Sequence, residues 1–510
     1  MVNNISISPN TSQYRIAKKS KPIKASILYI NDLHGQNIRM ERMVNVVNQF
    51  DRYTPSSDID KLKFASGDIM LGEDEKHIKV GDKFLNIAGF MANVIGNHEC
   101  DMPTDQFVSL VKDKKYKLLG LNMNPTANNP IKNYINKSYI QEINGHKYGI
   151  IGLVPPDLAK HVKLQEHLKD LNIETDFDKT IPEVQKEIDN LKRQGINKII
   201  ILSHSGYRQD IKLAKQLDGV DIILGAHTHN LIENIEKDKN LFYSKSGEPI
   251  IITQAGRDGK NFGRLDVEFN ENGVITKAQN NIGYTDKYNR NAVARYEFEK
   301  ILGKPEVVGI IKYAESYPKD AYGTENPHCD FICDALRTVL NTDVGVMNSA
   351  NIRGQFEKGK IDTRDLSIIS PFANKVAVIE ASEAELVNAI KNRVAASMKT
   401  NSHRPGIVQV SGLKYTFTKS GELKSLVFID KNGSESPIDI NNPRTDKMYK
   451  VAADDYCICS KENGLDLEHR FQNALEKYDF DKDIIIGRYI KQLNCPIEIK
   501  SDGRIKVLDE

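Results

Sequence analysis

The 510-residue sequence has little of several features that define whole classes of protein. Its six cysteines are too sparse for a disulfide framework, and none of them forms the C-x-x-C spacing of zinc and redox sites. We therefore expect free, buried thiols and a reducing compartment. No stretch approaches the roughly 18 apolar residues that a membrane helix needs, so we expect no membrane span.

The sequence also has little net charge, and its first residues have no apolar core. The formal charge is +2, with positive and negative residues mixed throughout, which argues against a dedicated surface for nucleic acid or anionic membranes. Residues 1–24 are polar and become basic towards Lys24, so they predict a disordered tail rather than a signal peptide. These observations together predict a cytoplasmic protein.

The length of the chain predicts two domains. Residues 25–285 alternate short apolar runs with longer helix-like segments, which is typical of an α/β domain. Residues 286–322 are charged and helical in pattern, and we expect a connecting helix there. Residues 323–510 mix strand-like and helix-like segments and predict a second, smaller α+β domain.

Polar motifs follow short apolar runs at five places in the first domain. Because the ends of strands are where an open α/β sheet presents its chemistry, we expect these motifs to form one site. The five motifs are Asp32-Leu33-His34, Gly67-Asp68, Gly96-Asn97-His98-Glu99 with Asp101, Ser203-His204, and Gly225-Ala226-His227-Thr228-His229.

These motifs supply enough oxygen and nitrogen ligands for two divalent metal ions. One partition places Asp32, His34 and His229 on the first metal and Asn97, His204 and His227 on the second, with Asp68 between the two. Mixed ligands of this kind suit zinc, manganese, iron or cobalt and do not select one of them. Paired metals are the usual means of hydrolysing a phosphate ester near neutral pH, with a metal-bound hydroxide as the nucleophile.

His98 is left free of the metals by this partition. Asp101, three residues further on, is placed to hold the imidazole in one orientation. A protonated His98 would stabilise the phosphoryl oxygens or protonate the leaving alkoxide. We therefore predict that His98 and Asp101 are catalytic residues.

The five motifs resemble the signature of the calcineurin-like metallophosphoesterases. Within that superfamily, the chain from Ser26 onwards resembles the bacterial two-domain 5′-nucleotidases, a family that also includes UDP-sugar hydrolases and 2′,3′-cyclic-nucleotide phosphodiesterases. The resemblance implies an α/β fold with a four-layer α/β/β/α N-terminal domain and a C-terminal substrate-specificity domain. It also implies hydrolysis of phosphomonoesters, with nucleoside 5′-monophosphates as the leading substrates.

The second half carries further motifs that resemble this family. Met347-Asn348-Ser349-Ala350-Asn351-Ile352-Arg353 resembles the loop whose arginine binds an anionic group of the substrate, and Ser370-Pro371-Phe372-Ala373-Asn374 resembles the turn whose phenylalanine stacks on the base. A guanidinium suits a carboxylate or phosphate, and an aromatic face suits a base. The resemblance implies that the substrate-binding residues are Asn97, Asn348, Arg353, Phe372 and Asn374.

The sequence departs from the family pattern in one loop, and this departure leaves substrates other than nucleoside monophosphates as alternatives. Relatives carry a second base-stacking aromatic in a glycine-rich loop, where this chain reads Asn463-Gly464-Leu465-Asp466-Leu467. A cyclic nucleotide, a UDP-sugar or a phosphate ester without a nucleotide is therefore the alternative substrate. The alternative that is not an enzyme is a binding or surface protein that keeps the fold without catalysing a reaction. The complete set of predicted metal ligands argues against it. In each of the enzyme cases the partner is a small phosphate ester.

Overall fold

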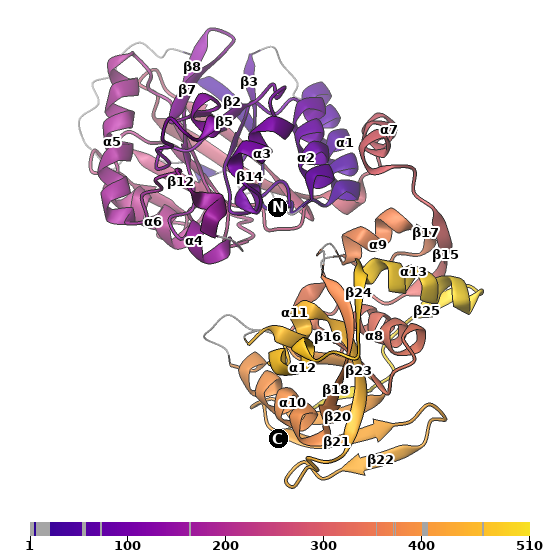
Figure 1. Cartoon of the computed structure of the whole chain (residues 1–510). Helices are drawn as coiled ribbons and strands as arrows, with labels where there is room; N and C mark the ends of the chain where they lie inside the picture. The colour runs from indigo at the N-terminus through magenta and orange to yellow at the C-terminus, as the bar shows by residue number, and fades with distance from the viewer. Residues whose placement is uncertain are drawn as a thin grey trace. The chain divides into compact units, whose positions relative to one another are not determined.

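The computed structural model divides the chain into two compact units, Met1–Lys304 and Pro305–Glu510, which are drawn together in Figure 1. It describes residues 5–6, 21–53, 58–71, 74–162, 165–352, 354–370, 372, 374–399, 406–461 and 464–509. Each unit has its own sheets and its own hydrophobic cores. They are described one after the other.

The first sheet of unit 1 has eight strands among the described residues, in the order β1-β14-β13-β2-β3-β4-β5-β6. Neighbouring strands from β2 to β6 are parallel, and β13 and β14 add an antiparallel hairpin beside β2. The strands are β1 (Ile5–Ser6), β2 (Ile23–Ile30), β3 (Ile59–Ala65), β4 (Ala92–Val94), β5 (Lys117–Leu119), β6 (Ile135–Asn136), β13 (Asn261–Phe269) and β14 (Ile275–Tyr284).

The second sheet of unit 1 has six strands in the described part of the chain, in the order β11-β12-β10-β9-β8-β7. Its four central strands are parallel, and every residue of β9, β10 and β12 is buried. Burial on both faces explains why these strands read as unbroken apolar runs. The strands are β7 (Ser138–Ile143), β8 (His146–Leu153), β9 (Ile199–Ser203), β10 (Ile222–Gly225), β11 (Leu241–Tyr243) and β12 (Pro249–Thr253).

Helices cover the outer faces of the two sheets, and Figure 1 shows α1 and α2 on one side and α5 and α6 on the other. Buried residues of both sheets, such as Leu62 and Ile200, share one hydrophobic core, while α5 and α6 form a second core on the outer face of the six-stranded sheet. This confirms the α/β class and gives the four layers that the resemblance implies. The helices of unit 1 are α1 (Asn37–Tyr53), α2 (Glu75–Ala88), α3 (Thr104–Leu110), α4 (Leu158–His161), α5 (Phe177–Arg193), α6 (Tyr207–Gln216) and α7 (Ala292–Leu302), with short 3-10 helices η1 (His98–Cys100), η2 (Pro130–Asn133), η3 (Gln165–Leu168) and η4 (Thr285–Lys287).

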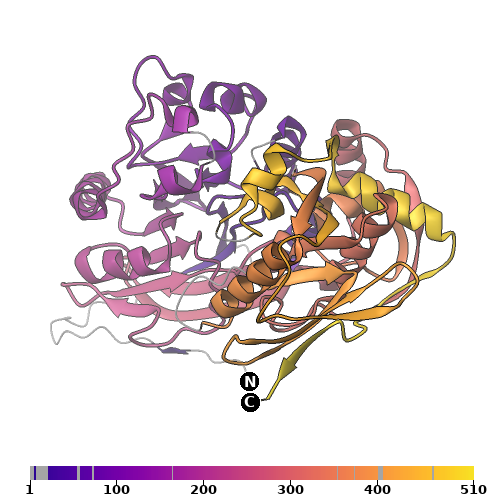
Figure 2. The ribbon, with the colours of Figure 1, turned by 60° about the horizontal axis from the view of Figure 1, so that its bottom comes forward.

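Unit 2 is a mixed α+β unit built around a five-stranded sheet, in the order β19-β16-β23-β18-β24 over the described residues. One core lies between this sheet and α10, which Figure 2 shows as an orange helix in front of the strands, and another lies between the sheet and α8 and α13. The strands are β16 (Val344–Asn348), β18 (Lys375–Ser382), β19 (Val408–Ser411), β23 (Met448–Asp454) and β24 (Glu476–Asp481). The helices are α8 (Pro327–Val339), η5 (Ser349–Asn351), α9 (Thr363–Ile369), α10 (Glu383–Ser397), α11 (Asp455–Cys459), α12 (Glu468–Gln472) and α13 (Lys482–Leu493).

Two smaller sheets complete unit 2 in the described ranges. In the four-stranded sheet, β20 and β21 form an antiparallel ladder. The four-stranded sheet contains β20 (Leu413–Thr418), β21 (Leu423–Ile429), β22 (Glu435–Ile438) and β26 (Ile505–Leu508), and the three-stranded sheet contains β15 (Val307–Ala314), β17 (Gly359–Asp362) and β25 (Ile497–Ile499).

The expected connecting helix over 286–322 is only partly helical. Helix α7 occupies 292–302, whereas Val307–Ala314 forms strand β15 and pairs with β17 and β25. Two Val and two Ile residues favour this strand, since β-branched side chains fit a pleated surface. Within the expected tail 1–24, Ile5–Ser6 pairs with β14 and β2 begins at Ile23, while residues 1–4 and 7–20 lie outside the described residues.

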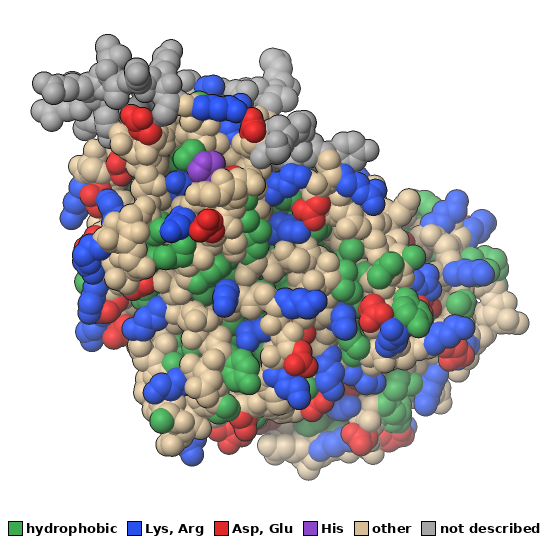
Figure 3. Space-filling view, turned by 90° about the horizontal axis from the view of Figure 1, so that it is seen from above, with side chains coloured by type: hydrophobic (Ala, Val, Ile, Leu, Met, Phe, Trp, Pro, Cys, Tyr) green, Lys and Arg blue, Asp and Glu red, His purple; other side chains and the backbone are tan. Residues whose placement is uncertain are grey.

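The cysteines and the surface agree with the composition. All six cysteines are free, but only Cys100, Cys329, Cys333 and Cys457 are buried as expected, whereas Cys459 is half-buried and Cys495 is exposed. Among the described residues, no helix combines the length and the apolar character that crossing a membrane requires. The face in Figure 3 carries Lys and Arg side chains interspersed with Asp and Glu rather than a field of one sign.

Candidate metal site and catalytic dyad

Five parallel strands of unit 1 deliver the predicted site residues from their carboxyl ends. Strands β2, β3 and β4 of the first sheet are followed by Asp32 and His34, by Asp68, and by Asn97 and His98. In the second sheet, β9 is followed by His204, and β10 is followed by His227 and His229. The chain leaves each strand at the edge of its sheet, so that residues far apart in sequence meet there.

The backbone at this edge is strained. Five of the predicted ligands have positive φ, namely Asp32 (50°), His34 (49°), Asp68 (53°), His227 (74°) and His229 (59°). Such conformations cost free energy for residues other than glycine and concentrate at functional sites, where they aim side chains inward. We infer that the strand ends adopt these conformations because they direct the predicted ligands into the site.

Two glycines allow the loops to approach each other closely. A Cβ atom on Gly67 would lie 2.5 Å from Nδ1 of His204, and one on Gly96 would lie 2.2 Å from Oδ1 of Asp68. Either contact would displace a predicted ligand. The glycines of the Gly67-Asp68 and Gly96-Asn97 motifs are therefore required by packing inside the site.

Among the described residues, four groups of three side chains each bring their possible ligand atoms within 4.8 Å of one another, and two of these groups share Asp32. The first group contains Asp32, His34 and His229, and its His229 Nε2 lies 3.5 Å from Oδ1 of Asp32. The second contains Asp32, Asp68 and His204, and its His204 Nε2 lies 3.2 Å from Oδ2 of Asp68. Nε2 of His34 is 3.7 Å from that same Asp68 oxygen, so Asp68 faces both groups.

The remaining two predicted ligands join this cluster. Nδ1 of His227 lies 3.1 Å from Oδ1 of Asn97, and the rings of His227 and His204 are 5.2 Å apart. The backbone N–H of His227 donates to the Asp32 carboxylate at 3.1 Å. The structure thus brings all seven residues together, and their partition between two metals stays a prediction.

The burial and electrostatics of the cluster fit a divalent cation. Asp32 and His204 are fully buried and Asp68 is 2% exposed. Burial lowers the pKa of His204, but the nearby Asp68 and Asp32 outweigh it and raise that pKa to about 10. Nε2 of His204 is buried without a well-directed hydrogen bond. A divalent cation of this kind is coordinated by carboxylate oxygens and imidazole nitrogens, and its positive charge would balance the charge of the buried carboxylates.

His98 and Asp101 form the expected pair beside this cluster. Nδ1 of His98 lies 2.6 Å from Oδ2 of Asp101, and the His98 backbone N–H donates to Oδ1 of Asp68 at 2.9 Å. Burial lowers the pKa of His98, whereas Asp68 and Asp101 raise it by more, so the net shift is upward. The two carboxylates therefore favour the protonated form of the imidazole beside the predicted metal ligands.

Three further acidic residues at the site were given no role from the sequence, although Glu99 stands inside one of the five motifs. Asp258 lies 3.0 Å from Nδ1 of His34, Asp157 lies 3.4 Å from Nε2 of His227, and Glu99 accepts hydrogen bonds from the backbone of the Gly67-Asp68 and Gly96-Asn97 turns. His161 lies 3.1 Å from the other oxygen of Asp157. Asp258 and Asp157 come shortly after β12 and β8, so the strand-end rule that found the other residues points to them too.

The predicted substrate-binding residues of the second half lie in unit 2, except for Arg353, which lies outside the described residues. Asn348 is buried at the end of β16, and Phe372 and Asn374 are half-buried in the segment before β18. Asn351 of η5 donates at 2.8 Å to Asp454, which also pairs with the buried Lys482. This network fixes the turn that follows Asn348.

The loop that departs from the family pattern is packed into a core. Leu465 and Leu467 are 4% and 5% exposed and belong to the core that α10 covers. Of the aromatic residues nearest in sequence, Phe471 is half-buried under the Nζ atom of Lys477, which lies 4.6 Å from its ring centroid, and Tyr456 is exposed on α11.

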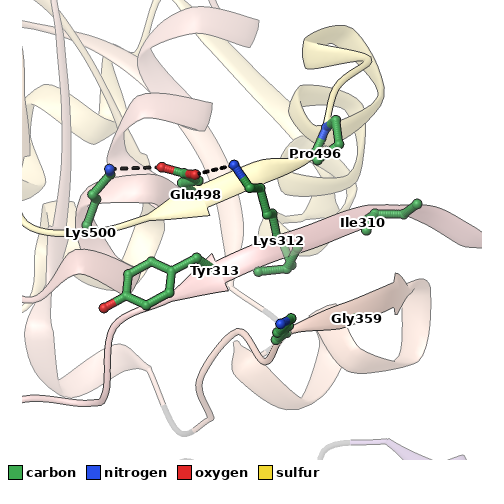
Figure 4. A pocket seen from close by; sticks show the side chains of 9 residues that line it. Ile310, Lys312, Tyr313, Gly359, Pro496, Glu498 and Lys500 are labelled. Carbon is green, nitrogen blue, oxygen red and sulfur yellow. Dashed lines mark hydrogen bonds and ion pairs between the residues drawn. The ribbon is translucent and has the colours of Figure 1, made fainter.

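A hollow of about 780 Å³ lies on the three-stranded sheet of unit 2 (Figure 4). Glu498 sits between Lys312 and Lys500, at 2.9 Å and 2.8 Å, and Ile310 and Tyr313 form its apolar part. It contains none of the predicted site residues. The chemistry-bearing cluster of this chain is therefore the one at the strand ends of unit 1.

Comparison with known proteins identifies both units. Residues 25–231 match the calcineurin-like phosphoesterase family, and residues 307–468 match the C-terminal domain of 5′-nucleotidases. The strand-end cluster lies within the first match. The class is therefore that of the metal-using calcineurin-like phosphoesterases.

Proteins of known activity resemble the chain over most of its length. The trifunctional nucleotide phosphoesterase protein YfkN of Bacillus subtilis is 24% identical over 94% of this chain and 35% of its own length. The 5′-nucleotidase of Rattus norvegicus is 25% identical over 83% of this chain and 77% of its own length. The crystal structure of a 5′-nucleotidase precursor from Thermus thermophilus covers 96% of this chain and all of its own, with a TM-score of 0.68 at 20% identity. The chain belongs to the two-domain 5′-nucleotidase family of calcineurin-like phosphoesterases.

Proposed function

We propose that this protein is a metal-dependent hydrolase of phosphomonoesters, with nucleoside 5′-monophosphates as its main substrates. The observation that carries the proposal is the convergence of the buried carboxylates Asp32 and Asp68 with histidines from three strand ends, beside the His98–Asp101 pair. The names of the relatives, which are nucleotide phosphoesterases and 5′-nucleotidases, support the same reaction class.

The proposed cofactors are two divalent cations from the group of zinc, manganese, cobalt and iron. Asp32, His34 and His229 would hold one, and Asn97, His204 and His227 the other, with the carboxylate of Asp68 shared. When bound, the cations would polarise the phosphoryl oxygens and lower the pKa of a coordinated water towards neutrality. The donor set supports this assignment, since it offers both carboxylate oxygen and imidazole nitrogen in one buried cluster.

His98 performs the proton chemistry in this proposal. Asp101 accepts from Nδ1, which fixes the ring and leaves Nε2 to donate a proton to the oxygen of the leaving alcohol. The positive charge of the same ring would stabilise the phosphoryl oxygens as negative charge develops on them. The upward shift of the His98 pKa, caused by Asp68 and Asp101, favours the protonated ring that this role requires.

Unit 2 supplies the proposed recognition of the nucleotide. In this assignment Arg353 binds an anionic group, Phe372 stacks on the base, and Asn348 and Asn374 contribute polar contacts, with Asn97 contacting the phosphate from unit 1. The match of residues 307–468 to the 5′-nucleotidase C-terminal domain supports these roles. The half-burial of Phe372 leaves part of its ring accessible for stacking.

A phosphate ester without a base is the second candidate substrate. Leu465 and Leu467, in the loop where relatives carry the second stacking aromatic, are buried in the core of unit 2. A base held on one face only would contribute less binding free energy, since stacking is worth roughly 1–3 kcal/mol per base. Sugar phosphates would then compete with nucleotides.

The test is release of phosphate from nucleoside monophosphates, 2′,3′-cyclic nucleotides and simple sugar phosphates, with manganese, zinc or cobalt supplied. UDP-glucose would be followed by product chromatography. We expect EDTA to abolish the activity and His98→Ala to reduce it, while His146→Ala, which removes a histidine paired with Asp60 at the amino end of β3, leaves it intact. A preference for substrates with a base supports the nucleotidase. A wild-type protein that is inert with every metal would contradict the proposal and favour a binding protein.

A further inference from the structure

The loop after β12 contacts the predicted metal ligands through one residue, Asp258. Its carboxylate oxygen Oδ1 lies 3.0 Å from Nδ1 of His34. Its backbone N–H donates to the carbonyl oxygen of Asp32 at 2.6 Å. Asp258 therefore holds two members of the first ligand group at once, although 224 residues separate it from His34 in sequence.

The surroundings of Asp258 keep its carboxylate in place. The residue is 1% exposed, and its backbone carbonyl accepts from Nη1 of Arg39 at 3.0 Å. Its second oxygen, Oδ2, lies 3.4 Å from Nε of Arg257 and 4.0 Å from Nζ of Lys260. A positive φ of 57° at a residue other than glycine shows that the loop is strained to make these contacts.

This contact fixes which nitrogen of His34 faces the cluster. An ionised carboxylate only accepts hydrogen bonds, so Nδ1 of His34 must carry a proton. Nε2 then presents its lone pair towards Asp68 and Asp32, whose oxygens lie 3.7 Å and 4.0 Å away. A carboxylate in this position orients a histidine ligand and raises its basicity, and its loss typically costs about 10- to 100-fold in metal affinity.

We propose that Asp258 is a positioning residue that sets the affinity of the first metal position by holding His34 with Nε2 towards it. The inference rests on the proposed function, because it presumes that the cluster binds divalent metal. His227 has a corresponding neighbour in Asp157, but that contact is longer, at 3.4 Å, and the Asp157 side chain is 40% exposed. Asp258 is the more buried of the two carboxylates and makes the shorter contact, so it is the stronger determinant.

The experiment is calorimetric titration of Mn²⁺ into the full-length, metal-free protein. We expect two binding events for the wild type, and an affinity lowered about 10- to 100-fold in only one of them for Asp258→Asn. Asp157→Asn should change the other event, and by less. The matched control is Asp60→Asn, which replaces a buried carboxylate that lies 2.8 Å from Nδ1 of the partly exposed His146, and should leave both events unchanged.

A double-mutant cycle separates positioning from a general loss of structure. In a His34→Gln background, Asp258→Asn should have no further effect on metal affinity, because its action passes through the imidazole. Asp258→Glu keeps the acceptor and should recover part of the affinity. It also serves as the working variant if Asp258→Asn does not fold.

The outcomes distinguish this inference from the proposed function. A wild type that binds no divalent ion would overturn the proposed function, and this inference with it. A wild type that binds two ions, together with a folded Asp258→Asn of unchanged affinities, would overturn only the inference. An equal effect of Asp258→Asn in the wild-type and His34→Gln backgrounds would also overturn it, since Asp258 would then act by another route.

Discussion

Nδ1 of His98 lies 2.6 Å from Oδ2 of Asp101, while the His98 backbone N–H donates to Oδ1 of Asp68. His98 is thus tied to the Asp101 carboxylate through its side chain and to a predicted metal ligand through its backbone. The proposed proton donor and the predicted ligands are held in one fixed relationship, because His98 of the short helix η1 makes both contacts.

Asp101→Asn should lower kcat by roughly 10- to 100-fold with little change in KM, because the imidazole loses its orientation but the substrate contacts remain. Asp101 also raises the pKa of His98, so the variant should lose activity at a lower pH than the wild type as His98 deprotonates. Steady-state kinetics on an aryl phosphate between pH 6 and about 9.5 measure both effects. Asp105→Asn, an exposed carboxylate of the next helix, is the control and should change neither. An unshifted pH profile in Asp101→Asn would show that His98 is not the titrating group.

Glu99→Gln should loosen the two loops that carry Asp68 and Asn97. The buried Glu99 carboxylate accepts from the backbone N–H groups of Asp68, Ile69 and Gly96, at 3.0, 3.1 and 2.9 Å. A glutamine amide offers only one acceptor oxygen, so at least one buried N–H would lose its partner, at a cost of about 1–3 kcal/mol.

Hydrogen exchange is the direct measurement of this effect. Peptides that cover 66–71 and 94–101 should exchange faster in Glu99→Gln, while the peptides of β9 and β10 should not. Glu75→Gln, at an exposed carboxylate of α2, provides the control. Unchanged protection of the two loops would show that other contacts hold them.

The sequence predicted the α/β class of the fold, and the polar residues that it placed at strand ends lie together in the structure. Unbroken apolar runs such as Ile199–Ser203 are readily predicted to be strands, because both faces of such a strand are buried. Strand β4 has only three residues, too few for periodicity to be recognised, yet the Asn97-His98 motif beyond it was found by its chemistry. Polar residues at strand ends are a local signal, and they need no knowledge of the neighbouring strands.

What the sequence could not give is pairing across long separations. Asp258 and His34 are 224 residues apart in sequence, and Asp157 and His227 are 70 residues apart. A local sequence pattern therefore predicts neither contact. The strand Val307–Ala314 was missed for a related reason. Its exposed Val307, Ile310 and Tyr313 make the segment look neither clearly buried nor clearly alternating, and pairing with β17 and β25 decides its state.

Asp210→Asn should reduce the pH dependence of stability. Asp210 is fully buried, and this burial raises its pKa to about 7, against the hydrogen bond from Ser203 Oγ at 2.5 Å. The pKa of Asp210 is higher in the folded protein than its unfolded value of about 3.9. The neutral carboxyl group therefore contributes its full stability only below about pH 3.9, and this contribution is lost as the pH rises to about 7. The loss amounts to at most about 4 kcal/mol.

Urea unfolding at pH 5 and at pH 8, with metal held saturating, measures this linkage. The variant should gain stability relative to the wild type between the two pH values, because asparagine has no charge to bury. Asp189→Asn, on the exposed side of α5, should follow the wild type. Parallel changes in Asp210→Asn and the wild type would mean that Asp210 stays ionised in the folded protein, with its charge compensated by His204.

Gly152→Ala should destabilise unit 1, because the two sheets meet at this position. A Cβ atom on Gly152 of β8 would lie 2.2 Å from Cβ and 3.0 Å from the carbonyl carbon of Leu119 in β5, so the sheets would have to separate. Overpacking of this kind typically costs about 1–3 kcal/mol. Gly487→Ala in α13 of unit 2 is the matched control, since its new Cβ would meet Leu366 at an ordinary 3.4 Å and alanine favours the helix by up to about 1 kcal/mol. Hydrogen exchange of β5 and β8 should rise only in Gly152→Ala, and equal protection in both variants would mean that the sheets are not packed face to face at this glycine.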